Sequence, residues 1–174
     1  FLPYDDVALS GVRSRALDDV SLSERTSDEL DLCSKWLTIK LDDDFPRAGD
    51  RAAMMVDIIE PCWVYAAPDM ADVTGIEVAV GNLPYNFQIG DQINDVKLVK
   101  PETEVGEVVV YKNSCDAADE VARLPLAPAT TSFGITTLKA PLEGVSDAAS
   151  LCFRIAAPHY EPIWAIDRVR LTRN

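Results

Sequence analysis

Hydrophobic and polar residues alternate over short segments from about residue 51 onward. In GIEVAV, residues 75–80, alternation would place Ile76, Val78 and Val80 on one face of a strand. Similar patterns, or short apolar runs, predict strands in AMMVDII (53–59), GEVVVY (106–111), residues 121–126, GITTLKAPL (134–142), SLCFRI (150–155) and WAIDRVRL (164–171). Turn-forming sequences rich in Gly, Asn, Asp and Pro separate these segments. Short strands at regular spacing with almost no helix predict an all-β fold, a β-sandwich or jelly roll, for residues 51–174.

The first 50 residues have a different pattern. They are charged and only weakly periodic, and they contain three clusters of aspartate. TSDELDLC (26–33) predicts a short helix with Thr26 or Ser27 as N-cap, and WLTIKL (36–41) alternates like a strand. We expect residues 1–50 to form an irregular arm or linker that packs on the sandwich or on a domain outside this chain.

The composition and net charge of the chain argue against some kinds of binding partner. The chain has 174 residues, of which 48% are hydrophobic, so it is long and apolar enough to fold around a core of its own. Asp and Glu number 29 against 16 Lys and Arg, which gives a net charge of −13. Such an acidic chain repels phosphate groups, so we expect no nucleic-acid partner and no anionic membrane partner. Its apolar runs are also too short to span a membrane.

The chain starts with FLPYDD, without an initiator methionine or a signal peptide. We interpret it as part of a longer protein whose targeting information lies upstream. Location therefore stays open, and a periplasmic or extracellular site is compatible with the sequence.

Four cysteines lie at widely separated positions: Cys33, Cys62, Cys115 and Cys152. None is in a C-x-x-C pair and the chain has one histidine, so the sequence predicts no zinc site of the usual clustered kind. Two disulfides would suit an exported protein, with Cys115 and Cys152 as the first pair to consider. We favour the alternative, four buried free thiols, because cysteine is often buried without a partner.

The last predicted strand carries a carboxylate. Strict alternation would place Asp167 on the apolar face, with Ala165, Val169 and Leu171. A buried carboxylate requires a partner, either an arginine or backbone N–H groups. The alternative is a structural Ca²⁺ bound by Asp167 together with Asp57 or Glu60. We favour the first interpretation and expect no other cofactor.

Aromatic and polar residues next to this strand could form a sugar-binding edge. Tyr160 and Trp164 flank Glu161, and Tyr85 and Asn86 offer a second patch in NLPYNFQIGD. Aromatic rings pack on the apolar faces of sugars, while acids and amides bind the hydroxyl groups. The alternative is that Trp164 fills the end of the sandwich and that the second patch is an ordinary hairpin.

Sequence motifs of the common enzyme classes are absent. The chain contains no nucleophile elbow, phosphate-binding loop, dinucleotide-binding fingerprint or H-E-x-x-H sequence. A glycosidase needs two carboxylates, but the acids here lie mostly in runs typical of solvated surfaces. We therefore expect no catalytic residue within this chain.

Four segments in order resemble the galactose-binding-like jelly rolls of carbohydrate-binding module families 6 and 35. They are WVYAAPDMADVTGIEVAV, GEVVVYKNSCDAADEVARLPL, GITTLKAPLEGVSDAASLCFRI and PIWAIDRVRL. The resemblance implies a galactose-binding-like sandwich and places Asp167 at a family metal-site position. Sugar-binding members have an aromatic and an asparagine where this chain has Ile135 and Ala165, and Phe133 is displaced. The resemblance therefore does not support sugar binding at the usual cleft.

A second resemblance covers nearly the whole chain. SGVRSRALDDVSLSERTSDELDLC, DIIEPCWVYAAPDM, GNLPYNFQIGD and LCFRIAAPHYEPIWAIDRVRL are similar to the region after the catalytic barrel in some bacterial family 20 glycoside hydrolases, the β-N-acetylhexosaminidases. This resemblance implies a non-catalytic C-terminal accessory domain. Its partners would be the catalytic domain of the parent enzyme and glycans that contain N-acetylhexosamine, held by Tyr160, Trp164, Tyr85, Asn86 and Glu161.

Two alternatives belong to other classes. The first is a structural or interaction domain with no sugar ligand, whose exposed aromatic residues form an interface. The second is an independent extracellular lectin-like module, which two disulfides would favour.

Overall fold

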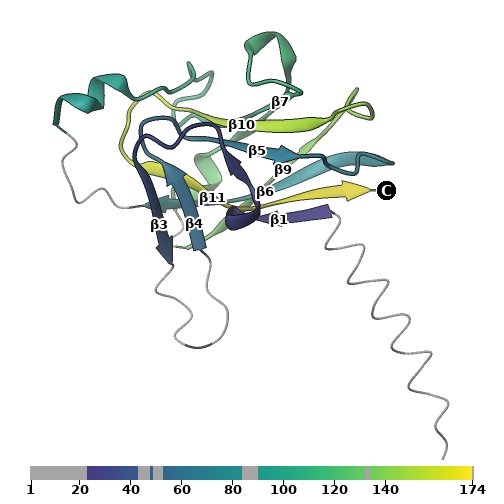
Figure 1. The fold of residues 1–174 in the computed structure, drawn as a ribbon, viewed down its shortest axis with the longest axis horizontal. Helices are drawn as coiled ribbons and strands as arrows, with labels where there is room; N and C mark the ends of the chain where they lie inside the picture. Colours follow the sequence, from purple (N-terminus) through teal and green to yellow (C-terminus); the bar gives the residue numbers. More distant parts are fainter. Residues whose placement is uncertain (1–22, 43–47, 49–52, 84–89, 132–133, 174) are drawn as a thin grey trace, which may run out of the picture.

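Two antiparallel β-sheets packed face to face form the body of the protein (Figure 1). The computed structural model describes residues 23–42, 48, 53–83, 90–131 and 134–173. One sheet has the strand order β1-β11-β6-β9, the other β2-β5-β10-β7-β8, and β3 and β4 form a separate two-stranded sheet. The strands are β1 (Glu24–Thr26), β2 (Asp31–Leu32), β3 (Thr38–Asp42), β4 (Ala53–Asp57), β5 (Cys62–Ala66), β6 (Val73–Leu83), β7 (Glu107–Lys112), β8 (Glu120–Pro125), β9 (Thr136–Pro141), β10 (Ser150–Ala156) and β11 (Ile163–Arg173).

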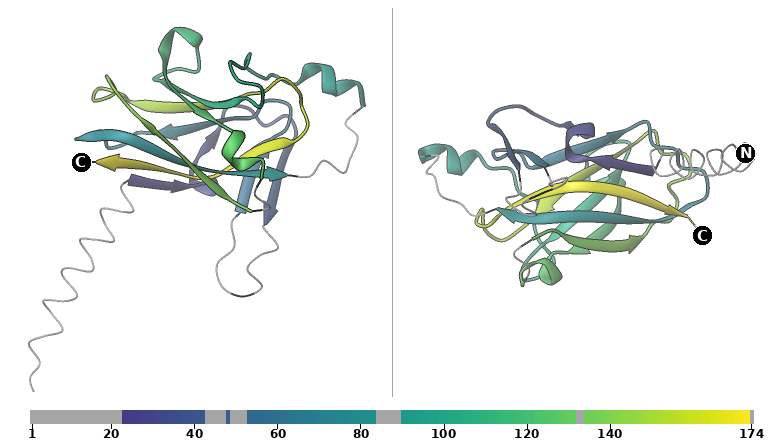
Figure 2. Two further views of the ribbon diagram at one scale, coloured as in Figure 1. Left: turned by 180° about the vertical axis from the view of Figure 1, so that it is seen from behind. Right: turned by 90° about the horizontal axis from the view of Figure 1, so that it is seen from below.

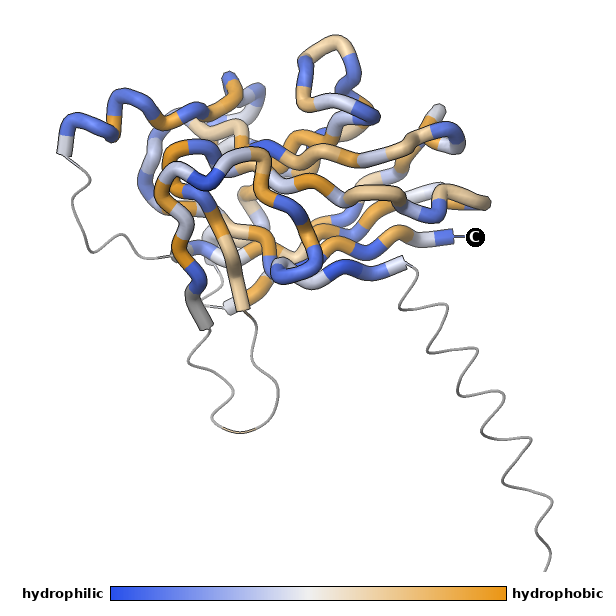
Figure 3. The backbone as a smooth tube through the Cα atoms, in the orientation of Figure 1, coloured by the Kyte–Doolittle hydropathy of each residue, from blue (hydrophilic) through white to orange (hydrophobic). Residues whose placement is uncertain are grey.

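Alternation along the strands fills the space between the two large sheets. On β10, Leu151 and Phe153 are fully buried and Ile155 is 3% exposed, so this face of the strand points into the core, as predicted. Across the core, β6 contributes Ile76, Val78 and Val80, which are also buried. Figure 3 shows hydrophobic and hydrophilic positions following one another along these strands. The predicted all-β sandwich is confirmed.

The C-terminal strand departs from strict alternation at one residue. β11 pairs with β6 along its length, as Figure 2 shows, but the register shifts between Ile166 and Arg168. A β-bulge inserts one extra residue and reverses the faces that follow it. Ile166 and Val169 therefore both point into the core, and Asp167 is the half-buried extra residue. The prediction that Asp167 shares an apolar face with Ala165, Val169 and Leu171 was wrong, because it assumed an unbroken period of two.

Strands from the first 42 residues extend all three sheets. β1 pairs with β11, β2 with β5 and β3 with β4. The predicted helix start at Thr26 is confirmed, but the helix is a single 3₁₀ turn, Ser27–Glu29. The Thr26 backbone N–H donates to Glu29 Oε2 at 2.9 Å, as in a capping box.

Helical structure is confined to short 3₁₀ segments in the described ranges. They are η1 (Ser27–Glu29), η2 (Gly90–Asp95), η3 (Ala117–Asp119) and η4 (Ala127–Ala129). Among these residues, no helix has the length and apolar character needed to span a membrane.

A buried carboxylate ties the loop before β7 to the five-stranded sheet. Glu107 is 1% exposed, and its carboxylate accepts hydrogen bonds from the backbone N–H groups of Thr103 at 2.6 Å and Glu102 at 3.2 Å. Arg123 Nη1 on β8 lies 3.3 Å from the same carboxylate. Burial acts to raise the pKa of Glu107, but the hydrogen bonds from Thr103 and the two amides, together with Arg123, lower the pKa overall.

Replacing Glu107 by glutamine should make the protein less stable and less sensitive to acid. The folded pKa lies below the ordinary 4.5, so this carboxylate stabilises the fold above pH 4.5 and the contribution is lost as pH falls through the folded pKa. We expect a loss of about 2 kcal/mol in the free energy of unfolding at neutral pH, which shrinks as the pH is lowered. Urea unfolding over a pH series would measure it, with exposed Glu104→Gln as the matched control. Equal pH dependence in wild type and Glu107→Gln would contradict the assignment.

Candidate ligand-binding pocket at Trp36

An open pocket lies where the loop before β3 meets the turn after β4 and the η2 segment. Its volume is about 440 Å³, and it is lined by Trp36, Leu37, Ile59, Gln92, Asp95 and Lys97. Trp36 is 73% exposed, although a tryptophan buries a large apolar surface when it packs in a core. The pocket therefore combines a solvent-accessible indole with amide, carboxylate and ammonium groups.

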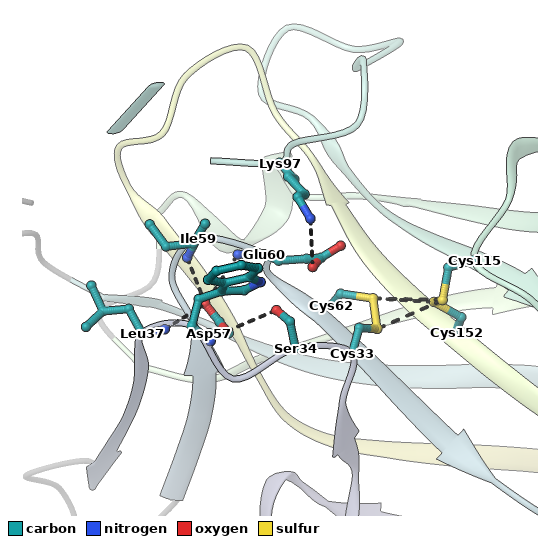
Figure 4. A network of polar contacts seen from close by, with 11 residues as sticks. Cys33, Ser34, Leu37, Asp57, Ile59, Glu60, Cys62, Lys97, Cys115 and Cys152 are labelled. Carbon is teal, nitrogen blue, oxygen red and sulfur yellow. Dashed lines mark hydrogen bonds and ion pairs between the residues drawn. A yellow bond between two sulfur atoms is a disulfide. The ribbon is translucent and has the colours of Figure 1, made fainter. Parts of the chain in front are cut away.

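A buried aspartate at the end of β4 builds the wall that carries Trp36. Asp57 is fully buried, and its carboxylate accepts a hydrogen bond from Ser34 Oγ at 3.0 Å (Figure 4). Four backbone N–H groups also donate to it, those of Trp36, Leu37, Ile59 and Glu60. Because Asp57 joins residues 34–37 to residues 58–60, it fixes the loop that presents the indole.

Lys97 forms one side of the pocket and makes two contacts with the turn after β4. The backbone N–H of Lys97 donates to the Ile59 carbonyl oxygen at 2.7 Å. Its ammonium group pairs with Glu60 Oε2 at 3.2 Å, and the lysine side chain is 51% exposed. Figure 4 shows this ion pair next to the Asp57 network. The Lys97 ammonium is thus held at the rim, where it is still accessible to a ligand.

This combination of groups suits a neutral polyhydroxylated ligand. An exposed indole offers a flat apolar face, and Gln92, Asp95 and Lys97 offer both donors and acceptors. The charged members of the lining are one carboxylate, Asp95, and one ammonium group, Lys97.

Two of the C-terminal residues that were predicted to bind sugar line a space that is almost filled. Trp164 is 3% exposed and belongs to the core, which agrees with the alternative that it fills the end of the sandwich. Tyr160 is half-buried against that core, Glu161 is exposed, and the space around Tyr160 and Trp164 is only about 10 Å³. Tyr85 and Asn86 lie outside the described residues. Sugar binding by this set stays a prediction.

Two of the predicted calcium ligands are engaged in other contacts. Asp57 faces five hydrogen-bond donors, and Glu60 pairs with Lys97. Within the described ranges, metal-binding side chains converge in one group, which consists of the four cysteines rather than Asp167, Asp57 and Glu60.

All four cysteines are paired, so the expectation of free thiols was wrong. Cys33 is bonded to Cys62, and Cys115 is bonded to Cys152, the pair considered first from the sequence. Cys62 on β5 and Cys152 on β10 lie on the outer face of the five-stranded sheet, and each is met by a cysteine from a loop. The bonded cysteines are 29 and 37 residues apart, so no short sequence motif indicated that these bonds form.

Positions that carry sugar-binding residues in the resembled modules are apolar here. Ala165 is fully buried, and Ile135 packs against the core. Phe133 lies outside the described residues. Both side chains are apolar and offer no hydrogen bond to a ligand, and the absence of sugar binding at the usual cleft stays a prediction.

Comparison with solved structures shows the fold of a carbohydrate-binding module. A family 6 module studied by sub-site dissection has a TM-score of 0.57 and 13% identity, over 87% of this chain and 94% of that one. The family 6 module from Clostridium cellulolyticum in complex with xylose has a TM-score of 0.56 and 14% identity, over 87% of this chain and 97% of that one. No family model and no curated protein matches the chain.

A larger enzyme contains the same fold. The family 43 arabinoxylan arabinofuranohydrolase from Bacillus subtilis, solved with cellotetraose, has a TM-score of 0.56 and 9% identity, over 87% of this chain and 27% of that chain. At these identities the likeness concerns the fold, a galactose-binding-like β-sandwich, as predicted.

Proposed function

We propose that this chain is a non-catalytic carbohydrate-binding domain whose ligand site is the pocket at Trp36. The observation that carries the proposal is the 73% exposure of the Trp36 indole beside polar side chains in a pocket of about 440 Å³. A sugar ring would stack on the indole, and its hydroxyl groups would bond to Gln92, Asp95 and Lys97.

The likeness of fold supports a binding role. The two family 6 modules that share this fold are carbohydrate-binding modules, and in the arabinofuranohydrolase the similar region is about a quarter of the chain. We therefore propose that the domain is an accessory part of a glycoside hydrolase. A family 20 β-N-acetylhexosaminidase as parent, with N-acetylhexosamine glycans as ligands, is the finer form of this proposal and rests on the sequence resemblance.

A second candidate function is docking of another protein domain. Among the described residues, the exposed large hydrophobic side chains are Trp36 and Ile93 at 44%. Ile93 lies on η2, which also lines the Trp36 pocket, so both could contact a catalytic domain.

Titration with defined glycans tests the sugar-binding proposal. N-acetylglucosamine, chitobiose, xylose and cellobiose would be titrated by calorimetry against wild type, Trp36→Ala, Tyr160→Phe and Ile93→Ala. We expect saturable binding of at least one glycan, weakened about 30-fold by Trp36→Ala, since a central aromatic side chain contributes about 2 kcal/mol. Tyr160→Phe and Ile93→Ala should bind as wild type does.

The other outcomes identify a different site or role. Loss of binding in Tyr160→Phe with Trp36→Ala unchanged would move the site to the C-terminal loop. Absence of binding to all glycans by wild type would reject the proposal and favour the docking function.

A further inference from the structure

Sulfur atoms from four separate segments meet on the outer face of the five-stranded sheet. Cys62 and Cys152 come from β5 and β10, whereas Cys33 and Cys115 come from the loops after β2 and β7. All four Sγ atoms lie within 4.8 Å of one another. Figure 4 shows the two disulfides side by side. The four cysteines therefore form one cluster, although the sequence contains no local metal-binding spacing.

Distances between the two disulfides match those of a tetrahedral thiolate site. Cys33 Sγ lies 3.9 Å from Cys115 Sγ, and Cys62 Sγ lies 3.9 Å from Cys115 Sγ and 3.6 Å from Cys152 Sγ. Four sulfur atoms at about 2.3 Å from a central zinc ion are about 3.8 Å apart. We propose that this cluster, once its disulfides are reduced, binds one thiophilic divalent ion such as Zn²⁺ through four thiolates.

The cluster has the surroundings of a structural metal site. Cys62 is 1% exposed and Cys152 is 2% exposed, and they pack with Val109, Tyr111 and Ala156. Cys33 is exposed, so a reductant and a metal ion can approach from one side. An apolar shell with one open edge keeps water from the thiolates and still permits loading.

A cation that lies next to the cluster would offset its charge. Four thiolates and one divalent ion carry a net charge of −2. Arg154 on β10 is directly opposite Cys62 on β5, so the two side chains share the outer face of the sheet. Arg154 Nε is buried and has no hydrogen-bond partner within the described part of the chain. A thiolate cluster next to Arg154 supplies an anionic partner for this otherwise unmatched donor.

The conversion requires a reductant, which we specify as a water-soluble phosphine. Each disulfide, one phosphine and one water give two thiols and one phosphine oxide, so two equivalents reduce the cluster. Binding of one divalent ion then releases four protons and forms four metal–sulfur bonds. The phosphorus atoms are oxidised and the sulfur atoms are reduced.

Cobalt binding provides the test, because tetrahedral Co²⁺–thiolate sites absorb visible light. The phosphine-reduced chain would be titrated with Co²⁺ under nitrogen, and circular dichroism would follow its folding. We expect one Co²⁺ per chain, with thiolate charge-transfer and tetrahedral d–d bands, displacement of Co²⁺ by Zn²⁺, and recovery of any β-structure lost on reduction. The oxidised chain is the matched control and should give none of these bands.

Two further outcomes bear directly on the proposal. Reduced Cys33→Ser has three thiols left, and its charge-transfer band should fall by about a quarter, with at least tenfold weaker binding. A reduced wild-type chain that neither shows the bands nor regains structure with Co²⁺ or Zn²⁺ would overturn the proposal. Neither readout depends on sugar binding, so this inference and the proposed function can fail separately.

Discussion

Replacing Asp57 by alanine should lower the free energy of unfolding by about 3–4 kcal/mol and abolish the Trp36 pocket. The carboxylate is fully buried and accepts from five donors, four of them backbone N–H groups. Without it those donors lose their acceptor, and residues 34–37 lose their attachment to the turn after β4. Because native domains are stable by only about 5–15 kcal/mol, this single change should remove a large share of the stability.

Chemical unfolding and glycan titration would measure the two effects together. Asp57→Asn tests the effect of charge at nearly constant side-chain volume. The NH₂ group of the asparagine would face backbone N–H donors, so we expect about 3 kcal/mol of destabilisation in this variant too. Asp116→Asn is the matched control, because Asp116 is exposed and its side chain makes no capping hydrogen bond. A loss below about 1 kcal/mol in Asp57→Ala would show that water replaces the carboxylate.

The strands of the sandwich could be predicted because their signals are local. Alternation in SLCFRI correctly placed Phe153 in the core, and the β-branched run in GEVVVY became β7. The face of Asp167 could not be predicted in the same way, because a β-bulge depends on how β11 pairs with β6. Alternation of residues between the two faces of a strand can be used for prediction only in stretches without a β-bulge.

The candidate site was missed because its residues come from separate segments and its aromatic residue looked ordinary. Trp36 opens an alternating sequence, where a tryptophan is usually read as part of a strand face. In the structure β3 begins at Thr38, so Trp36 precedes the strand and projects to solvent. One available signal was the buried Asp57, since a carboxylate in an apolar run implies a cluster of backbone N–H groups around it.

Removing both disulfides should destabilise the protein about twice as much as replacing Asp57 by alanine. The bonded cysteines are 29 and 37 residues apart, and closing loops of these lengths lowers the entropy of the unfolded chain by about 3–4 kcal/mol each. The two loops, 33–62 and 115–152, do not overlap in sequence, so their effects on the entropy of the unfolded chain add to about 7 kcal/mol. Phosphine reduction in the presence of a metal chelator should therefore bring the chain close to its unfolding midpoint at room temperature.

Variants that remove one pair at a time distinguish the two disulfides by function. Cys33→Ala/Cys62→Ala and Cys115→Ala/Cys152→Ala should each lower the free energy of unfolding by about 3–4 kcal/mol in urea. Only the first pair should weaken glycan binding. Cys33 adjoins Ser34, at the start of the loop that presents Trp36, whereas Cys115 lies in the loop after β7.

Equal binding by the two double variants, both still folded, would show that Asp57 alone holds the Trp36 loop in place. Loss of binding in the first variant would show that the covalent link and the Asp57 hydrogen bonds are both required. The second double variant is the matched control, because it has a similar entropic effect on the unfolded chain and leaves the Trp36 loop attached. The comparison thus separates general destabilisation from a specific effect on the pocket.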